Sequence, residues 1–288
     1  MKRVPLLIVP ALAVVLAACS IGPMAVRASM PIMDGSLVAM NRETDLTLAG
    51  MAIPANIKML DGMIETDPDN SILLTYAAQG LYGYAYGFVE DGDSARASAL
   101  YLRGLGYAER GLRLAGLTLD LMRSRQEDLE QAVSRLGKDA VPVLFWGASN
   151  LARWVYLNRS DPQAIAHIGR AKVLMERVLQ LDDTYYYGGA HLFFGVYYGS
   201  LSPMFGGDYE RARRHFDMAS SMTKGKLLMV DVLYAESLAR QTLDRKAFHE
   251  KLTAVVQAPI DVFPQMALAN RIAQEKAQHL LDKEKEWF

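Results

Sequence analysis

Apolar side chains recur every three or four positions along most of this 288-residue chain, which is the spacing of an amphipathic helix. Ile57, Leu60 and Ile64 form one such face. Clusters of Asp, Pro, Gly and Asn, such as residues 67–70 and 91–94, separate the apolar runs and predict turns with helix caps. No segment alternates apolar and polar residues for long enough to require a strand. The pattern therefore predicts an all-α protein.

The stretch 191–219 carries the most informative pattern. Gly195 and Tyr198 are followed by Ala212 and Phe216, in the order G-x2-Y and then A-x3-F. These are the two halves of a tetratricopeptide (TPR) repeat. In such a unit small residues let two antiparallel helices approach closely, while the rings fill the remaining space. We therefore expect a helical hairpin here.

Related patterns recur elsewhere. Ala97, Tyr101 and Gly104 repeat the small–aromatic–small order, and residues 171–178 repeat its spacing. We therefore expect residues 36–288 to form a TPR-like stack of antiparallel helical hairpins, in a short right-handed superhelical array. It is TPR-like because the spacings depart from the regular period of about 34 residues. The Gly-interrupted, charged segment 115–140 predicts a shorter, solvated helix.

The turn inside the stretch 191–219 is unusually long. Tyr198 and Ala212 are 14 positions apart, whereas about nine separate the corresponding residues of a common repeat. The extra residues include Met204 and Phe205, followed by Asp208, which is placed to cap the second helix. Such a turn is either a packed lid or a contact surface. We favour the lid, because long loops usually bury some of their own side chains.

The first residues of the chain differ from the rest. Two basic residues precede an apolar run at positions 4–16, which is too short to span a bilayer and indicates a signal peptide. The ending Leu-Ala-Ala-Cys resembles the lipobox of bacterial lipoproteins, which implies that Cys19 receives a diacylglycerol and acyl chains such as palmitate. We expect residues 1–18 to be the signal peptide and residues 19–35 to be a lipid-anchored tether. Pro and Gly residues leave no sustained helical periodicity in this tether, and Ser36 is placed to cap the helix that follows it. An ordinary signal peptide with a chance cysteine is the alternative.

The residue after Cys19 bears on the membrane that would hold the anchor. Ser20 stands where an Asp would indicate retention in the inner membrane of lipoproteins of this class. We therefore expect a periplasm-facing protein anchored to the outer membrane, with the inner membrane as the alternative. Cys19 is the only cysteine of the chain, so lipidation also accounts for the absence of a disulfide partner.

Composition and motifs argue against several function classes. The net charge of −1 and the absence of a Lys/Arg run argue against a nucleic-acid partner. None of the five histidines is paired at a spacing of three or four residues, so we expect no metal site. No Gly-rich phosphate loop follows a strand, and no G-x-S-x-G elbow is present. We expect no enzyme, no catalytic residue and no cofactor.

The aromatic residues are the remaining functional candidates. Three tyrosines at residues 82–86 lie two positions apart, so on a helix they point in different directions and cannot all face one core. A buried tyrosine also needs a partner for its hydroxyl, which a wet groove or interface supplies. Neighbouring helices that surround all these rings are the alternative. The residues we expect in a ligand groove or interface are Tyr82, Tyr84, Tyr86, Tyr197, Tyr198 and Phe205.

Several segments, in their order along the chain, resemble one known family. The segments are residues 82–88, 100–104, 145–146, 206–216 and 268–281. Together they cover nearly all of the mature chain, which resembles the T-component lipoproteins of TRAP transporters (the TatT family). The resemblance implies a TPR-like lipoprotein that forms a homotrimer and docks a TRAP-type periplasmic substrate-binding protein. It also implies a pore or cleft that passes a small ligand, and it carries over no catalytic residue.

The leading hypothesis is therefore a lipid-anchored accessory subunit of a TRAP-type transport system. One alternative is a generic outer-membrane TPR lipoprotein that acts as an interaction scaffold in envelope assembly. The other is a hydrolase within a helical scaffold, which would need an acid–base pair in a pocket.

Overall fold

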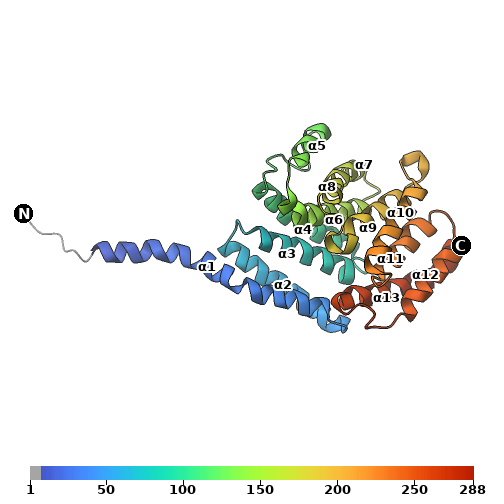
Figure 1. Ribbon diagram of the computed structural model, residues 1–288, viewed down its shortest axis with the longest axis horizontal. Helices are drawn as coiled ribbons and strands as arrows, with labels where there is room; N and C mark the ends of the chain where they lie inside the picture. Colours follow the sequence, from blue (N-terminus) through green and yellow to red (C-terminus); the bar gives the residue numbers. More distant parts are fainter. Residues whose placement is uncertain (1–7) are drawn as a thin grey trace, which may run out of the picture.

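Helices make up all the regular secondary structure in the described part of the chain, which confirms the predicted all-α class (Figure 1). The computed structural model describes residues 8–288, with side chains from residue 21 onward. The predicted signal-peptide cleavage and the acylation of Cys19 therefore fall outside the described side chains. No helix among the described residues is long and apolar enough to cross a membrane.

The longer helices follow one another through short turns, so neighbours along the chain pack side by side as hairpins (Figure 1). Two helices, α3 and α11, continue directly into wider π-helical turns. The helices are α1 Ile8–Asn41, α2 Leu46–Thr66, α3 Ser71–Tyr84 with π-turn Ala85–Val89, α4 Ser94–Leu114, α5 Gln126–Ser134, α6 Val141–Leu157, α7 Pro162–Ile165, α8 Ile168–Leu181, α9 Tyr185–Ser200, α10 Tyr209–Thr223, α11 Met229–Leu233 with π-turn Tyr234–Ala239, α12 Arg245–Gln257, α13 Ala267–Asp282 and α14 Glu284–Trp287.

The hairpin of α9 and α10 has the predicted contacts. A Cβ added at Gly195 would lie 2.9 Å from the ring of Phe216, so only glycine lets the helices approach this closely. Ala212 is fully buried in the same seam, beside the buried Tyr198. The Asp208 carboxylate accepts a hydrogen bond from the backbone N–H of Arg211 and caps α10, as predicted. Small residues and rings thus hold this pair together.

Helix α1 differs from the expectation. The segment 20–35 is helical, whereas its Pro and Gly residues had indicated an irregular tether, and Ser36 lies inside the helix instead of capping a new one. Val26 and Met33 are buried against Leu60 and Ile64 of α2. Their spacing of seven residues places them on one face, and that burial outweighs the two internal prolines. Whether this segment also serves as a tether stays a prediction.

The sequence predicted an N-cap at Ser36, but the residue that caps the N-terminus of α2 is Asp45. Its carboxylate accepts hydrogen bonds from the backbone N–H groups of Thr47 and Leu48 at the start of α2. Farther along, the predicted short helix in the segment 115–140 is α5, but it is only partly solvated. Leu129 and Val133 are buried in the main core.

The long turn between α9 and α10 is also different from the expectation. Met204 is 85 % exposed and Phe205 is 74 % exposed, so the predicted packed lid is wrong. Hydrogen bonds within the backbone shape the turn, from the N–H of Gly207 to Ser202 and from the N–H of Asp208 to Tyr198. These bonds provide partners for backbone groups of the turn without burying its side chains. The side chains of Met204 and Phe205 therefore project into solvent.

The last long helix packs against the first two. Leu268 and Ile272 of α13 form a buried cluster with Ala49 of α2, and Met40 of α1 and Phe88 of the first π-turn pack against it. In Figure 1, α13 lies beside the near ends of α1 and α2, although more than two hundred residues separate these elements. The stack of hairpins therefore curls until its ends meet, and it partly surrounds an interior space.

Candidate functional site

The interior space is a cavity of about 730 Å³. Ligand pockets in proteins commonly measure roughly 300–1,000 Å³ and are lined mainly by apolar side chains. The inward faces of α1, α2, α3, α6, α9 and α13 form the wall, together with both π-turns. Such turns widen a helix locally and often occur at functional sites. This cavity is the leading candidate for a ligand site.

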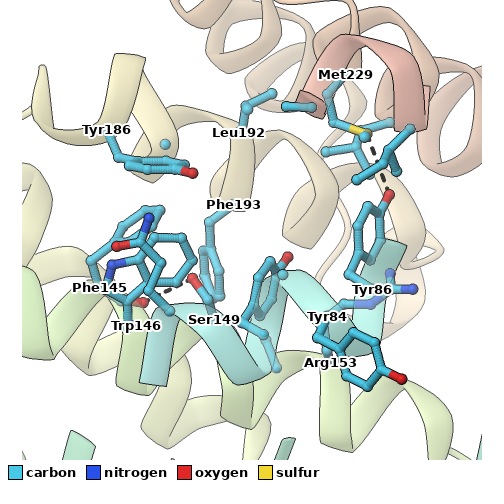
Figure 2. A pocket seen from close by; sticks show the side chains of 18 of the residues that line it. Tyr84, Tyr86, Phe145, Trp146, Ser149, Arg153, Tyr186, Leu192, Phe193 and Met229 are labelled. Atoms are coloured by element: carbon cyan, nitrogen blue, oxygen red, sulfur yellow. Dashed lines mark hydrogen bonds between the residues drawn. The ribbon is translucent and has the colours of Figure 1, made fainter. Parts of the chain in front are cut away.

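One end of the cavity is aromatic (Figure 2). The rings of Phe145 and Trp146 on α6 meet edge to face with centroids 4.9 Å apart. Tyr186 packs against Trp146 with centroids 4.8 Å apart, and Phe193 of α9 also lines the wall. Edge-to-face contacts of this kind stabilise aromatic clusters and hold their rings in place. This end offers a rigid apolar surface to a ligand.

A turn of left-handed backbone places Tyr186 in that wall. Tyr186, Tyr187 and Gly188 have φ values of 47°, 59° and 77°. For residues other than glycine this conformation costs roughly 1–2 kcal/mol each. Glycine suits position 188, because any side chain would be strained at this positive φ and its Cβ would also lie 2.6 Å from Sδ of Met222. Backbone strain of this kind tends to occur at functional sites, and here it orients the ring of Tyr186 towards Trp146.

The opposite side of the cavity carries Tyr86 (Figure 2). Its hydroxyl donates to Sδ of Met229 at 3.4 Å. The guanidinium of Arg153 lies 4.9 Å from the Tyr86 ring centroid, and the ammonium of Lys276 lies 4.4 Å from it. Two cations thus face one ring, which is an attractive arrangement for each of them. Burial raises the pKa of the Tyr86 hydroxyl, so it stays protonated.

Arg153 is held from several directions. Its Nε and Nη2 atoms donate to the carboxylate of Glu90, and both side chains are largely buried. The hydroxyl of Tyr101 donates to the same carboxylate at 2.5 Å. The ring of Tyr156 lies 4.5 Å from the guanidinium. A buried ion pair needs such additional partners to offset its desolvation cost, so the position of this arginine is tightly defined.

All the charged side chains that line the cavity lie together. They come from the C-terminal part of α6 and the turn after it, and from the second π-turn and the residue that follows it. Tyr156 joins the two groups, because its hydroxyl lies 3.4 Å from Oε1 of Glu236. The charged lining residues are Arg153, Arg159, Glu236 and Arg240. This end of the cavity is therefore cationic, and the rest of the lining is uncharged.

The structure separates the residues predicted for a groove or interface. Tyr82, Tyr84, Tyr86 and Tyr197 line the cavity. Tyr198 lies instead in the seam between α9 and α10, where the guanidinium of Arg211 covers its ring at 4.1 Å. Phe205 lies in the exposed turn and not in the cavity lining. Burial thus places one side chain of the set in the core and one on the surface.

Two histidines that are far apart in sequence meet in the core. Nδ1 of His191 and Nδ1 of His215 are 2.9 Å apart, so one ring donates to the other. Burial lowers the pKa of both rings, and His191, Arg211 and Arg214 further lower that of His215, to about 4. No cluster of three or more metal-ligating side chains occurs among the described residues. The pair therefore joins α9 to α10 as neutral rings.

Sequence reasoning missed the cationic end of the cavity. Trp146, Ser149, Arg153 and Tyr156 are spaced by three or four residues and line one face of α6. An arginine on the inward face of a largely buried helix was the signal that could have found it, because such a charge needs a buried partner. Glu90, the partner, lies 63 residues away along the chain. Sequence alone gave no reason to bring them together.

Comparison with known proteins identifies the chain's relatives. The model of the family described as TRAP transporter T-component matches residues 42–288, which begin immediately after α1. The match includes every cavity-lining element except α1. No curated protein matches the chain.

Proposed function

This chain belongs to the TRAP transporter T-component family, and on that basis we propose that it docks a TRAP-type periplasmic substrate-binding protein and passes a small ligand through its cavity. The family consists of accessory subunits of transport systems and is not a family of enzymes. The observation that carries the ligand role is the cavity of about 730 Å³, with its aromatic and cationic ends. A space of this size and lining is suited to holding a ligand.

The exposed turn between α9 and α10 is the proposed docking point for the partner. Met204 and Phe205 project from it, and exposed apolar side chains of this size are typical of protein interfaces. Ser200 and Leu201, which immediately precede the turn, line the cavity. A partner bound at the turn would therefore lie next to the cavity wall, where a ligand could pass between the two proteins.

Co-purification from the native membrane tests the docking role. We expect the wild-type protein to recover a TRAP-type substrate-binding protein, and the variant Met204→Ser/Phe205→Ser to recover much less of it. Ile260→Ser, another exposed apolar position outside the turn, is the matched control. Failure of the wild type to recover this partner would contradict the proposal. Recovery of envelope-assembly proteins in its place would favour the scaffold role.

Lipid anchoring at Cys19 is a separate part of the proposal. The apolar leader and its small-residue ending support it. We expect Cys19→Ala to leave an unprocessed or soluble protein that lacks the acyl mass and no longer fractionates with the outer membrane. An unchanged mass and an unchanged membrane fraction would contradict anchoring. The proposed homotrimer is tested by light scattering of the purified protein.

A further inference from the structure

We propose that the ligand of the cavity is an amphiphile with one anionic head group and an extended apolar chain. In this assignment Arg159 and Arg240 bind the head group at one end of the cavity, and Arg153 supplies a further hydrogen-bond donor there. The aromatic end binds the apolar chain. The inference rests on the ligand-handling role proposed above and names the chemistry of the ligand. It follows from three features of the cavity.

The first feature is the distribution of charge. The lining holds three arginines and one glutamate, all at one end, so that end carries a net positive charge. Arg159 and Arg240 are exposed, whereas Arg153 is largely buried. The cationic end therefore reaches solvent, and an anionic head there would stay partly hydrated. A field of one sign at an opening also attracts an oppositely charged ligand.

The second feature is an unused hydrogen-bond donor. Arg153 donates from Nε and Nη2 to Glu90, while its Nη1 atom donates to none of the described residues. Glu90 does not line the cavity, so it holds the guanidinium from behind. The rings of Tyr86 and Tyr156 lie over the same guanidinium and help to fix its direction. A preorganised donor is therefore present on the cavity wall, and an anionic oxygen is its strongest partner.

The third feature is the length of the apolar wall. Phe145 and Tyr156 lie eleven residues apart on the inward face of α6, which corresponds to a rise of roughly 16 Å along the helix. Leu192 and Phe193 of α9 also line the wall, as does Ile57 of α2. A compact organic acid would leave most of this surface in contact with water. An extended hydrocarbon chain would cover it.

Head-group preference is the direct test. The full chain carrying Cys19→Ala, which prevents a covalent acyl chain from occupying the cavity, is loaded with the fluorescent probe 11-(dansylamino)undecanoate. The probe is then displaced by dodecanoate, dodecanol or dodecyltrimethylammonium. We expect dodecanoate to bind about tenfold more tightly than dodecanol, since hydrogen bonds between charged groups exceed neutral ones by this order. Dodecyltrimethylammonium should bind most weakly.

Chain length gives an independent readout. From octanoate to decanoate to dodecanoate, we expect affinity to increase roughly fourfold for each added methylene that enters the cavity. Affinity that does not depend on chain length would overturn the assignment of the apolar chain to this wall.

Two kinds of variant localise the binding. Arg159→Gln/Arg240→Gln should lower the affinity for dodecanoate to about that for dodecanol and leave dodecanol unchanged, with Arg113→Gln as the control at an exposed arginine outside the cavity. Gly83→Trp should abolish binding of every probe, because Gly83 lines the cavity and a Cβ there meets nothing within 4 Å. Gly106→Trp is its matched control, since Gly106 also has open space but does not line the cavity.

The outcomes separate this inference from the proposed function. Equal affinity for the three head groups, or no effect of Arg159→Gln/Arg240→Gln, would overturn the anionic head while leaving the ligand role intact. Binding that persists unchanged in Gly83→Trp would overturn the location. Absence of any probe binding by the wild type would overturn both the inference and the proposed passage of a ligand, and docking of the partner protein would still be decided by co-purification.

Discussion

The seam between α9 and α10 and the wall of the cavity use the same residue types in opposite ways. Tyr197 and Tyr198 are adjacent in sequence, but Tyr198 is buried in the seam and Tyr197 lines the cavity. In the seam, Gly195 and Ala212 let two helices come into contact. Along the wall, Gly83 faces open space. Whether a partner helix is present therefore decides what a tyrosine or a glycine does.

This difference has an energetic consequence. Protein interiors are packed closely, so any change of volume in the seam must strain or expose its neighbours. Added volume at a wall position such as Gly83 meets empty space and should alter ligand binding more than stability. The following predictions test that contrast, beginning with the largest expected effect.

Removal of the largest side chain in the seam should be the most damaging change. Phe216 is almost completely buried and packs against Gly195 and Tyr234. We expect Phe216→Ala to lower the free energy of unfolding by about 3–5 kcal/mol, because it leaves a cavity in the core. Urea denaturation measures this change. A loss below about 0.5 kcal/mol, the size of an ordinary surface substitution, would show that the seam tolerates empty space and would remove the contrast.

Adding volume in the seam should also be costly. Ala212 has no exposed surface, and we expect Ala212→Leu to destabilise the fold by about 1–3 kcal/mol through overpacking. The measurement is the thermal melting temperature, compared with Met218→Leu at an exposed position of the same helix. An unchanged melting temperature would show that α10 can move away from α9.

Acidification should weaken the seam through its histidine pair. The pKa of His215 is about 4 in the folded protein, below its usual 6.5, because of burial and of His191, Arg211 and Arg214. The unfolded chain therefore binds a proton at a higher pH than the folded chain. We expect the contribution of His215 to the free energy of unfolding to be fully present above pH 6.5 and to be lost as the pH decreases towards 4. Asp183, 4.0 Å from Nε2 of His191, reduces the effect.

Melting curves between pH 7.5 and 4.5 measure this loss. His215→Gln should flatten the pH dependence between pH 6.5 and 4.5, whereas His279→Gln, at an exposed site, should leave it as in the wild type. Equal slopes for the two variants would show that the pair does not couple protonation to folding.

Removal of tyrosine hydroxyls should separate the wall from the seam. Each change to Phe keeps the ring and removes the hydroxyl, at a cost of about 0.5–1.5 kcal/mol where a hydrogen bond is lost. We expect at least one of the wall variants Tyr82→Phe, Tyr84→Phe, Tyr86→Phe and Tyr197→Phe to weaken probe binding with little change in stability. Tyr198→Phe should leave probe binding intact. Stability losses at all five positions, without any change in affinity, would contradict a ligand cavity.

The smallest expected effect is a slight stabilisation in the wall. Gly83 lies inside α3, and an added Cβ has open space around it. Alanine lowers the entropy of the unfolded chain and favours the helix, so we expect Gly83→Ala to stabilise the protein by about 0.4–1 kcal/mol. Gly195→Ala, the matched change in the seam, should destabilise it because its Cβ would meet the Phe216 ring. Stabilisation by both changes would contradict close packing in the seam.

Local signals in the sequence predicted much of the fold. Periodic apolar residues gave the helices, Asp208 gave the cap of α10, and the pair of motifs around Gly195 and Phe216 gave the hairpin. The same signals failed for residues 20–35, where two prolines indicated an irregular segment and contact with α2 stabilised a helix instead. Local preferences are weak, and burial against another element can outweigh them.

The sequence also determined which residues were candidates for the site, but it did not determine where they lie. It identified the tyrosines at residues 82–86 and 197–198, because side chains at this spacing on a helix point in different directions and cannot all face one core. Tertiary structure decided that four of them line a cavity and that Tyr198 does not. It also brought Glu90 to Arg153 and packed α13 against α1 and α2. The physical reason is that a helix's periodicity defines its faces, whereas only the packing of distant helices decides which faces meet one another and which enclose a space.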